Sequence, residues 1–120
     1  MASLLTGNAW AEGVGDSVQG AAVFKKCQSC HQVGEDANNR VGPQLNDIFG
    51  RTAGGLAGAK YSKSMIGAGE GGLVWSAETL DTFLENPKSL VARTRMSFRG
   101  LKDKEDRANL IAYLSEFSDG

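Results

Sequence analysis

The sequence predicts an all-α domain of about four to five helices joined by long loops. Apolar residues recur at helical spacing in three separate segments, and no segment shows sustained two-residue alternation bounded by turn residues. Hydrophobic residues make up 41% of the chain, and 16 of its 120 residues are glycine. A small chain with a modest core and long loops is expected to fold around a buried ligand.

The first helix is expected to begin after Asp16, a good N-cap residue with Gln19 three positions later. Val23, Phe24 and Cys27 follow at helical spacing. This pattern predicts a short helix at the start of the domain.

The middle of the chain is predicted to be mostly loop. Residues 50–72 are rich in Gly, Ala and Ser, with one short helix expected to start near Ser62. Ser76 can cap a further helix, which Asn86-Pro87 should end and which carries Leu80, Phe83 and Leu84.

The last helix is expected to start at Asp103, and its apolar residues fall on one face at Leu110, Ile111, Leu114 and Phe117. The chain has the length of one domain, which we place at residues 16–120. Residues 1–15 are predicted to form a flexible lead-in or linker remnant. No segment of the sequence approaches the roughly 20 apolar residues of a membrane span.

The formal net charge of −1 argues against nucleic-acid binding, because nucleic-acid binders are normally basic. The charge is nevertheless unevenly distributed. From Lys88 to Arg107 there are seven Lys or Arg residues and three acids. The sequence therefore predicts a local basic face.

Cys27 and Cys30 are the two cysteines of the chain, and His31 follows them directly. This is the pattern of c-type haem attachment, in which two thiols add to two vinyl groups and the histidine reaches the iron. A thioredoxin-like redox pair is expected beside a βαβ pattern, which the sequence lacks, and a structural zinc site would need a fourth ligand. A chance match is the remaining alternative, and covalent haem attachment is the interpretation we favour.

Further motifs follow in order over residues 16–117. They are Gly20 and Phe24, Gly42-Pro43-x-Leu45, Phe49-Gly50-Arg51, Tyr61-Ser62, Trp75, Leu84-x-Asn86-Pro87-Lys88, Thr94-x-Met96-x-Phe98 and Arg107-x-x-Leu110-Ile111-Ala112-Tyr113-Leu114. In these motifs the chain resembles the class I cytochromes c, especially the bacterial cytochromes c and c2 related to mitochondrial cytochrome c. The resemblance implies the class I cytochrome c fold, wrapped around one haem c bonded to Cys27 and Cys30.

The resemblance also implies the iron ligands His31 and Met96. The chain has two other methionines. Met1 lies at the end expected to be flexible, and Met65 lies where the family has no ligand. Met96 stands at the family's ligand position, where a thioether raises the potential of the haem. Core packing is the alternative role for any methionine.

Six further positions are implied to contact the haem, namely Pro43, Arg51, Tyr61, Trp75, Thr94 and Phe98. The carbonyl of Pro43 would accept a hydrogen bond from Nδ1–H of His31, and Phe98 would shield the haem. The other four residues would approach the haem propionates. For Arg51 the alternative is a solvated charge, and for Trp75 it is ordinary core packing. Gly20 is expected to permit close contact between the first and last helices.

Three features depart from the family pattern. Ala92-Arg93 stands where the family often has Pro-Gly, and Phe83 stands where a tyrosine usually faces the methionine sulfur. The segment between Tyr61 and Trp75 is longer than in mitochondrial proteins. The loop before Met96 is therefore less defined by its sequence, and the differences favour a bacterial member.

The resemblance implies an electron-transfer protein and not an enzyme. Its expected partners are a cytochrome bc1-type donor and an oxidase, a reaction centre or a dehydrogenase. We expect docking through a basic face made of Lys25, Lys26, Lys88, Arg93, Arg95 and Arg99.

The expected location is the bacterial periplasm, with the mitochondrial intermembrane space as the alternative. An export signal or a membrane anchor is expected outside this chain, because haem c attachment belongs to exported proteins. Two alternative functions remain open. One is the haem domain of a membrane-anchored or fused cytochrome, and the other is a peroxidase or gas-binding haem protein.

Overall fold

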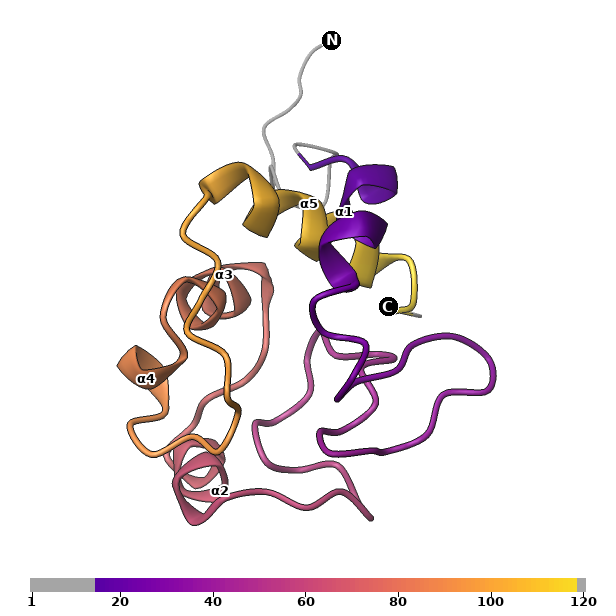
Figure 1. Cartoon of the computed structure of the whole chain (residues 1–120). Helices are drawn as coiled ribbons and strands as arrows, with labels where there is room; N and C mark the ends of the chain where they lie inside the picture. The colour runs from indigo at the N-terminus through magenta and orange to yellow at the C-terminus, as the bar shows by residue number, and fades with distance from the viewer. Residues whose placement is uncertain (1–14, 119–120) are drawn as a thin grey trace, which may run out of the picture.

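A computed structural model describes residues 15–118, which form five helices connected by long loops (Figure 1). The predicted lead-in therefore lies, apart from Gly15, outside the described residues. Within the described range the β pairing is a single antiparallel bridge between Thr52 and Val74. The helices are α1 (Ser17–Phe24), α2 (Lys63–Glu70), α3 (Ala77–Glu85), α4 (Pro87–Leu90) and α5 (Lys104–Ser115). The predicted all-α class and helix number are confirmed.

Four helices begin at the predicted capping residues. The Asp16 carboxylate accepts the backbone N–H groups of Val18 and Gln19 at 2.9 and 3.3 Å. Gln19 contributes its backbone N–H to this cap. The N-cap side chains of α2, α3 and α5 also accept backbone N–H groups. These N-caps are Ser62, Ser76 and Asp103. Each cap satisfies donors that the first turn of a helix leaves without a partner.

Helix α4 is absent from the sequence prediction, in which Asn86-Pro87 only ends the preceding helix. Asn86 is indeed the C-cap of α3, but Pro87 then occupies the first position of a new four-residue helix. Proline suits that position because its fixed φ is helical and its missing N–H would have had no helical partner.

Helices α1 and α5 cross in close contact at one end of the molecule (Figure 1). A Cβ added at Gly20 would lie 2.0 Å from the carbonyl oxygen of Asn109, so only glycine allows this approach. The rings of Phe24 and Tyr113 lie 5.5 Å apart between the helices. The predicted contact between the first and last helices is therefore confirmed.

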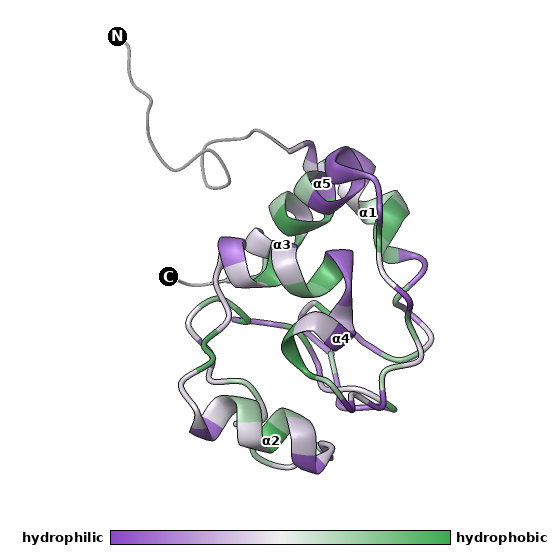
Figure 2. Ribbon diagram, turned by 90° about the vertical axis from the view of Figure 1, so that its left-hand side faces the viewer, coloured by the Kyte–Doolittle hydropathy of each residue, from purple (hydrophilic) through white to green (hydrophobic). Residues whose placement is uncertain are grey.

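Helix α2 lies at the opposite end from α1 and α5 in both views, and it carries polar residues at its two ends (Figure 2). None of its residues is fully buried, and Met65 and Ala68 are partly buried against the core. The core itself is built from α1, α3, α5 and the intervening loops. Among residues 15–118, no helix combines the length and the apolar character needed to cross a membrane.

Candidate cofactor site

A cavity of about 440 Å³ opens between the loops and the inner faces of α3 and α5. Its volume falls within the range of small-molecule and cofactor sites. Nine of the ten residues expected to bind the haem line it, and they are Cys27, Cys30, His31, Pro43, Arg51, Tyr61, Trp75, Thr94 and Met96. The tenth, Phe98, is not among the lining residues and is partly buried against the core.

The two cysteines lie in the turns that follow α1. The N–H groups of Cys30 and His31 both donate to the carbonyl of Cys27, at 3.1 and 2.9 Å. This tight winding brings both thiols and the imidazole to one wall of the cavity. Both cysteines are free and partly buried, and burial, together with the charge of Cys30, raises the pKa of Cys27 to about 11. Neither thiol is part of a disulfide.

The imidazole of His31 is fixed by two contacts with the turn at residues 42–43. Its Nδ1–H donates to the carbonyl oxygen of Pro43 at 2.7 Å. A Cβ added at Gly42 would lie 2.4 Å from Cε1 of the ring, so the ring packs directly on the glycine backbone. With Nδ1 protonated by this bond, Nε2 keeps the lone pair that a metal needs.

Burial also lowers the pKa of His31, although the hydrogen bond that its ring donates to the Pro43 carbonyl opposes that shift and Arg51 adds to it. This shift favours the neutral imidazole, which is the form that binds a metal. Gly42 and Pro43 both belong to a motif of the family resemblance, which implied a role in holding His31 only for Pro43. The close contact of Gly42 with the ring depends on the folded turn and has no sequence signal of its own.

Two methionines line the cavity, Met65 and Met96. Met96 lies in the extended segment before α5, and its backbone N–H donates to the Thr94 hydroxyl at 3.2 Å. Met65 lies in the first turn of α2, where its backbone N–H donates to Ser62 at 3.0 Å. Both side chains are partly buried against the core. The position of Met65 on the cavity wall did not emerge from the sequence.

Three cationic side chains line the cavity, namely Arg51, Lys60 and Arg95, and no carboxylate within residues 15–118 does so. Arg51 donates to the carbonyl oxygens of Gln44, at 2.9 Å, and of Asn46. Burial lowers the pKa of Arg51, and its neighbour Tyr61 opposes that shift. The cavity therefore favours a ligand that carries negative charge at its edge.

Trp75 and Phe83 are two of the four aromatic residues that line the cavity. Their rings lie 5.0 Å apart in an edge-to-face arrangement, and both residues are buried. The Trp75 backbone is paired with the neighbouring loop, since its N–H donates to Arg51 and its carbonyl accepts from Gly50. The aromatic wall is thus attached to the same loop that carries Arg51.

These residues fit a covalently attached haem. Two thiols, an imidazole and two thioethers line the cavity, and the remaining lining is largely apolar. The cations at Arg51, Lys60 and Arg95 suit the two carboxylates of a haem. Sequence analysis missed Lys60, because its location at the cavity depends on how the loop before Tyr61 folds.

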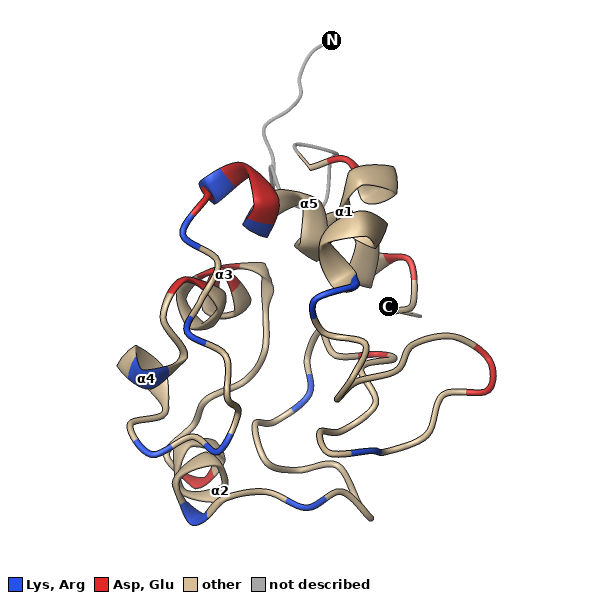
Figure 3. Ribbon diagram, viewed as in Figure 1, with Lys and Arg blue, Asp and Glu red and all other residues tan. Residues whose placement is uncertain are grey.

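The six residues of the expected basic face are all exposed: Lys25, Lys26, Lys88, Arg93, Arg95 and Arg99. In Figure 3 basic positions lie along α4, along the chain after α1 and along the extended segment before α5. Acidic positions gather at the start of α5 and on α3. One of the six, Arg95, also lines the cavity.

Comparison with known proteins gives concordant matches. A family model described as Cytochrome c matches residues 17–118. A cytochrome c2 of Afifella marina is 50% identical over 98 residues, which cover 82% of this chain and 79% of that protein. A cytochrome c of Cannabis sativa is 44% identical over 106 residues, which cover 85% of this chain and 90% of that protein.

Among solved structures, cytochrome c2 from Rhodospirillum centenum matches with a TM-score of 0.83 and 39% sequence identity. The match covers 87% of this chain and 99% of that one. The family match spans every helix from α1 to α5.

Proposed function

The chain belongs to the cytochrome c family, and we propose that it carries single electrons, with His31 and Met96 as the residues that would hold its haem iron. As a member of this family it is an electron-transfer protein with one haem c, bonded to Cys27 and Cys30. The observation that carries the ligand proposal is the fixed imidazole of His31, whose Nδ1–H is held by Pro43 at 2.7 Å. Its other nitrogen is thereby left available to the iron.

The haem supplies the one-electron couple of its iron, and the protein residues provide the setting. Pro43 orients the His31 ring and raises its basicity. The thioether of Met96 would serve as the second protein ligand and would favour a high potential. The apolar wall excludes water, while the cations of Arg51 and Lys60 offset carboxylate charge at the edge of the cavity. Electron transfer through such a site requires no acid–base pair.

A test of the carrier function is the reaction of the reduced, haem-loaded protein with carbon monoxide at neutral pH. A carrier with two protein ligands should titrate as a single one-electron couple and should not bind carbon monoxide. Rapid carbon monoxide binding by the native protein would instead support the gas-binding or peroxidase alternative and contradict the carrier proposal.

The partners we propose are a bc1-type electron donor and an acceptor such as an oxidase, a reaction centre or a dehydrogenase. The bacterial cytochromes c2 among the relatives support the periplasm as the location. Docking would use the six exposed basic residues, of which Arg95 lines the cavity, although the chain has a net charge of −1. Opposite charges accelerate encounter and permit rapid release.

The docking proposal is tested by the dependence of the bimolecular electron-transfer rate on ionic strength. The rate should fall as salt rises, because the screening length shortens to about 10 Å at 0.1 M. Reversing Lys26, Lys88 and Arg95 to Glu should lower the rate and weaken its salt dependence. Reversal of Lys104, which lies in the first turn of α5, is the control and should change the rate less. A rate unaffected by salt and by the triple reversal would contradict the proposal.

A further inference from the structure

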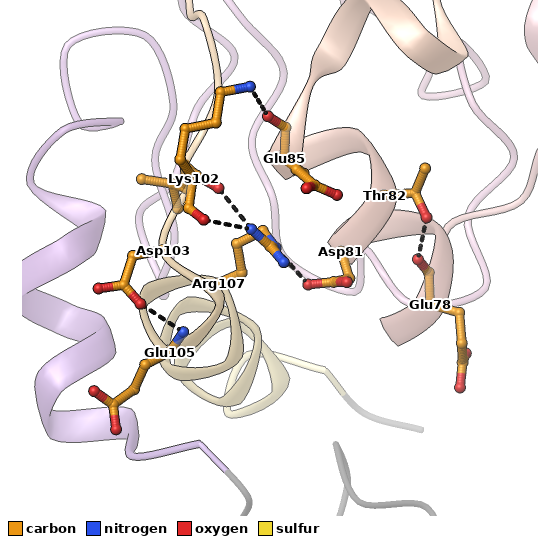
Figure 4. Close-up of polar contacts among 9 residues, drawn as sticks. Glu78, Asp81, Thr82, Glu85, Lys102, Asp103, Glu105 and Arg107 are labelled. Carbon is orange, nitrogen blue, oxygen red and sulfur yellow. Dashed lines mark hydrogen bonds and ion pairs between the residues drawn. The ribbon is translucent and has the colours of Figure 1, made fainter.

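We propose that the ion pair between Asp81 and Arg107 positions Met96 by holding the end of the segment that carries it. We name residues 92–99 the methionine segment. This inference rests on the proposed ligation by Met96 and adds two residues that do not touch the cavity. The ion pair links α5 to α3, and it lies beside the part of the chain that directly follows the methionine segment (Figure 4).

Arg107 connects three parts of the chain. Its Nε donates to Oδ1 of Asp81, on α3, at 2.7 Å. Its Nη1 donates to the carbonyl oxygens of Leu101 at 2.9 Å and Lys102 at 3.2 Å. One guanidinium on α5 therefore binds a carboxylate on α3 and the two residues that follow Gly100 (Figure 4).

The same two residues are bound to the end of α3 by contacts of their own. The Leu101 N–H donates to the carbonyl of Leu84 at 2.6 Å, and Nζ of Lys102 donates to the carbonyl of Glu85 at 2.6 Å. Gly100 has a φ of +125°, and a Cβ there would lie 2.1 Å from the Glu85 carbonyl oxygen. The end of the methionine segment is thus fixed on α3.

The interior of the methionine segment has weaker support. The N–H of Thr94 donates back to Val91 at 3.1 Å, and the N–H of Arg93 donates to the Ser64 hydroxyl at 3.3 Å. Neither Ala92 nor Arg93 is a proline, so the backbone here lacks the restriction that proline imposes. The position of Met96 therefore depends on the two ends of its segment.

The two ends are held differently. At the start, Val91 is 1% exposed, and apolar burial holds it. At the other end, the Arg107 side chain is 8% exposed and carries a charge that Asp81 neutralises. Removing one partner of such a pair leaves an uncompensated, largely buried charge. Asp81 also fixes the direction of the guanidinium, and hence its bonds to Leu101 and Lys102.

The experiment measures how fast imidazole binds to the ferric, haem-loaded protein, because imidazole can reach the iron only when Met96 has moved away. Asp81→Asn should raise this rate by roughly tenfold, because the neutral amide can still accept from Nε but leaves the largely buried guanidinium without its counter-charge. Arg107→Lys should also raise it, since a single ammonium cannot replace the fork of donors. The sulfur-to-iron charge-transfer absorption of the resting ferric protein should persist but weaken.

Two controls separate positioning from stability. Glu78→Gln removes a charge from the same helix, three residues before Asp81, at an exposed position, and should leave the rate unchanged. Asn109→Ala removes the 2.7 Å bond from the N–H of Asp16 and should lower the unfolding temperature without accelerating imidazole binding. The proposal would be overturned if Asp81→Asn bound imidazole no faster than Glu78→Gln. It would also be overturned if Asn109→Ala accelerated imidazole binding as much as Asp81→Asn does.

A third comparison keeps this inference distinct from the ligation on which it rests. If native protein binds imidazole as fast as Met96→Ala, ligation by Met96 is wrong and the inference falls with it. If native protein is slow and Met96→Ala is fast, ligation stands. The rate of imidazole binding to Asp81→Asn then tests only whether the ion pair positions Met96.

Discussion

His31 is held by contacts of its own ring, whereas Met96 is held through the backbone of the segment that carries it. The imidazole donates to Pro43 and packs on Gly42, and both neighbours lie 11 or 12 positions along the chain. The Met96 side chain has no comparable partner among the contacts described above, and its nearest bond is between its N–H and Thr94. One candidate ligand is thus fixed locally, and the other depends on distant residues.

This difference indicates which substitutions act on which side of the cavity. A change at the turn of residues 42–46 should act on the imidazole directly. A change near Met96 should act on the rate at which its segment opens, because local opening is governed by the weakest contacts of a segment. The stability of the protein therefore probes the His31 side, and the rate of ligand binding probes the Met96 side.

The largest effect is expected for Gly42→Ala. The new Cβ would lie 2.4 Å from Cε1 and 2.8 Å from Nδ1 of His31, so the ring or the turn must move. Overpacking of this kind costs about 1–3 kcal/mol, which thermal unfolding of the haem-loaded protein would measure. Gly67→Ala is the control, since nothing lies within 4 Å of a Cβ there and alanine favours a helix. Equal destabilisation by both would show that Gly42 does not fix the imidazole.

A smaller effect is expected for Arg51→Gln. The guanidinium binds the carbonyls of Gln44 and Asn46, just after Pro43, and thereby supports the turn that holds the imidazole. Loss of one or two such bonds should lower the free energy of unfolding by about 1–2 kcal/mol. The rate of imidazole binding should change little. Arg40→Gln, at an exposed position, is the matched control, and equal losses in both variants would place the support of the turn elsewhere.

The smallest effect is expected for Ser64→Ala, on the Met96 side. The Ser64 hydroxyl accepts the N–H of Arg93 at 3.3 Å, a long bond near the surface. Its loss should cost about 0.5 kcal/mol, equivalent to a two- to threefold faster binding of imidazole, and should lower the unfolding temperature by only about 2–4 °C. An acceleration as large as that of Asp81→Asn would mean that α2 holds the methionine segment, contrary to our inference.

Much of the fold was accessible from the sequence because its signals are local. The N-caps Asp16, Ser62, Ser76 and Asp103 each lie within three residues of the donors that they accept, and all four begin helices. The haem motif is likewise contiguous. Helix α4 was missed because Pro87 both ends one helix and begins the next, and the sequence alone indicates only the first role.

The remaining features depend on contacts between distant residues. The pairing of Asp81 with Arg107 spans 26 positions, and neither residue has a neighbouring pattern that identifies the other. The places of Lys60 and Met65 on the cavity wall depend on the path of the loop and helix between Tyr61 and Trp75. Phe98 was expected at the haem but packs against the core without lining the cavity, so its shielding role stays a prediction.

The most direct test of the proposed site compares Met96→Leu with Met65→Leu, because both methionines line the cavity and leucine preserves their volume without offering a sulfur. The measurement is the sulfur-to-iron charge-transfer absorption of the ferric, haem-loaded protein, together with its reduction potential. We expect Met65→Leu to keep the absorption and the potential, and Met96→Leu to lose the absorption and lower the potential. An absorption that survives in Met96→Leu and disappears in Met65→Leu would contradict the assignment of Met96.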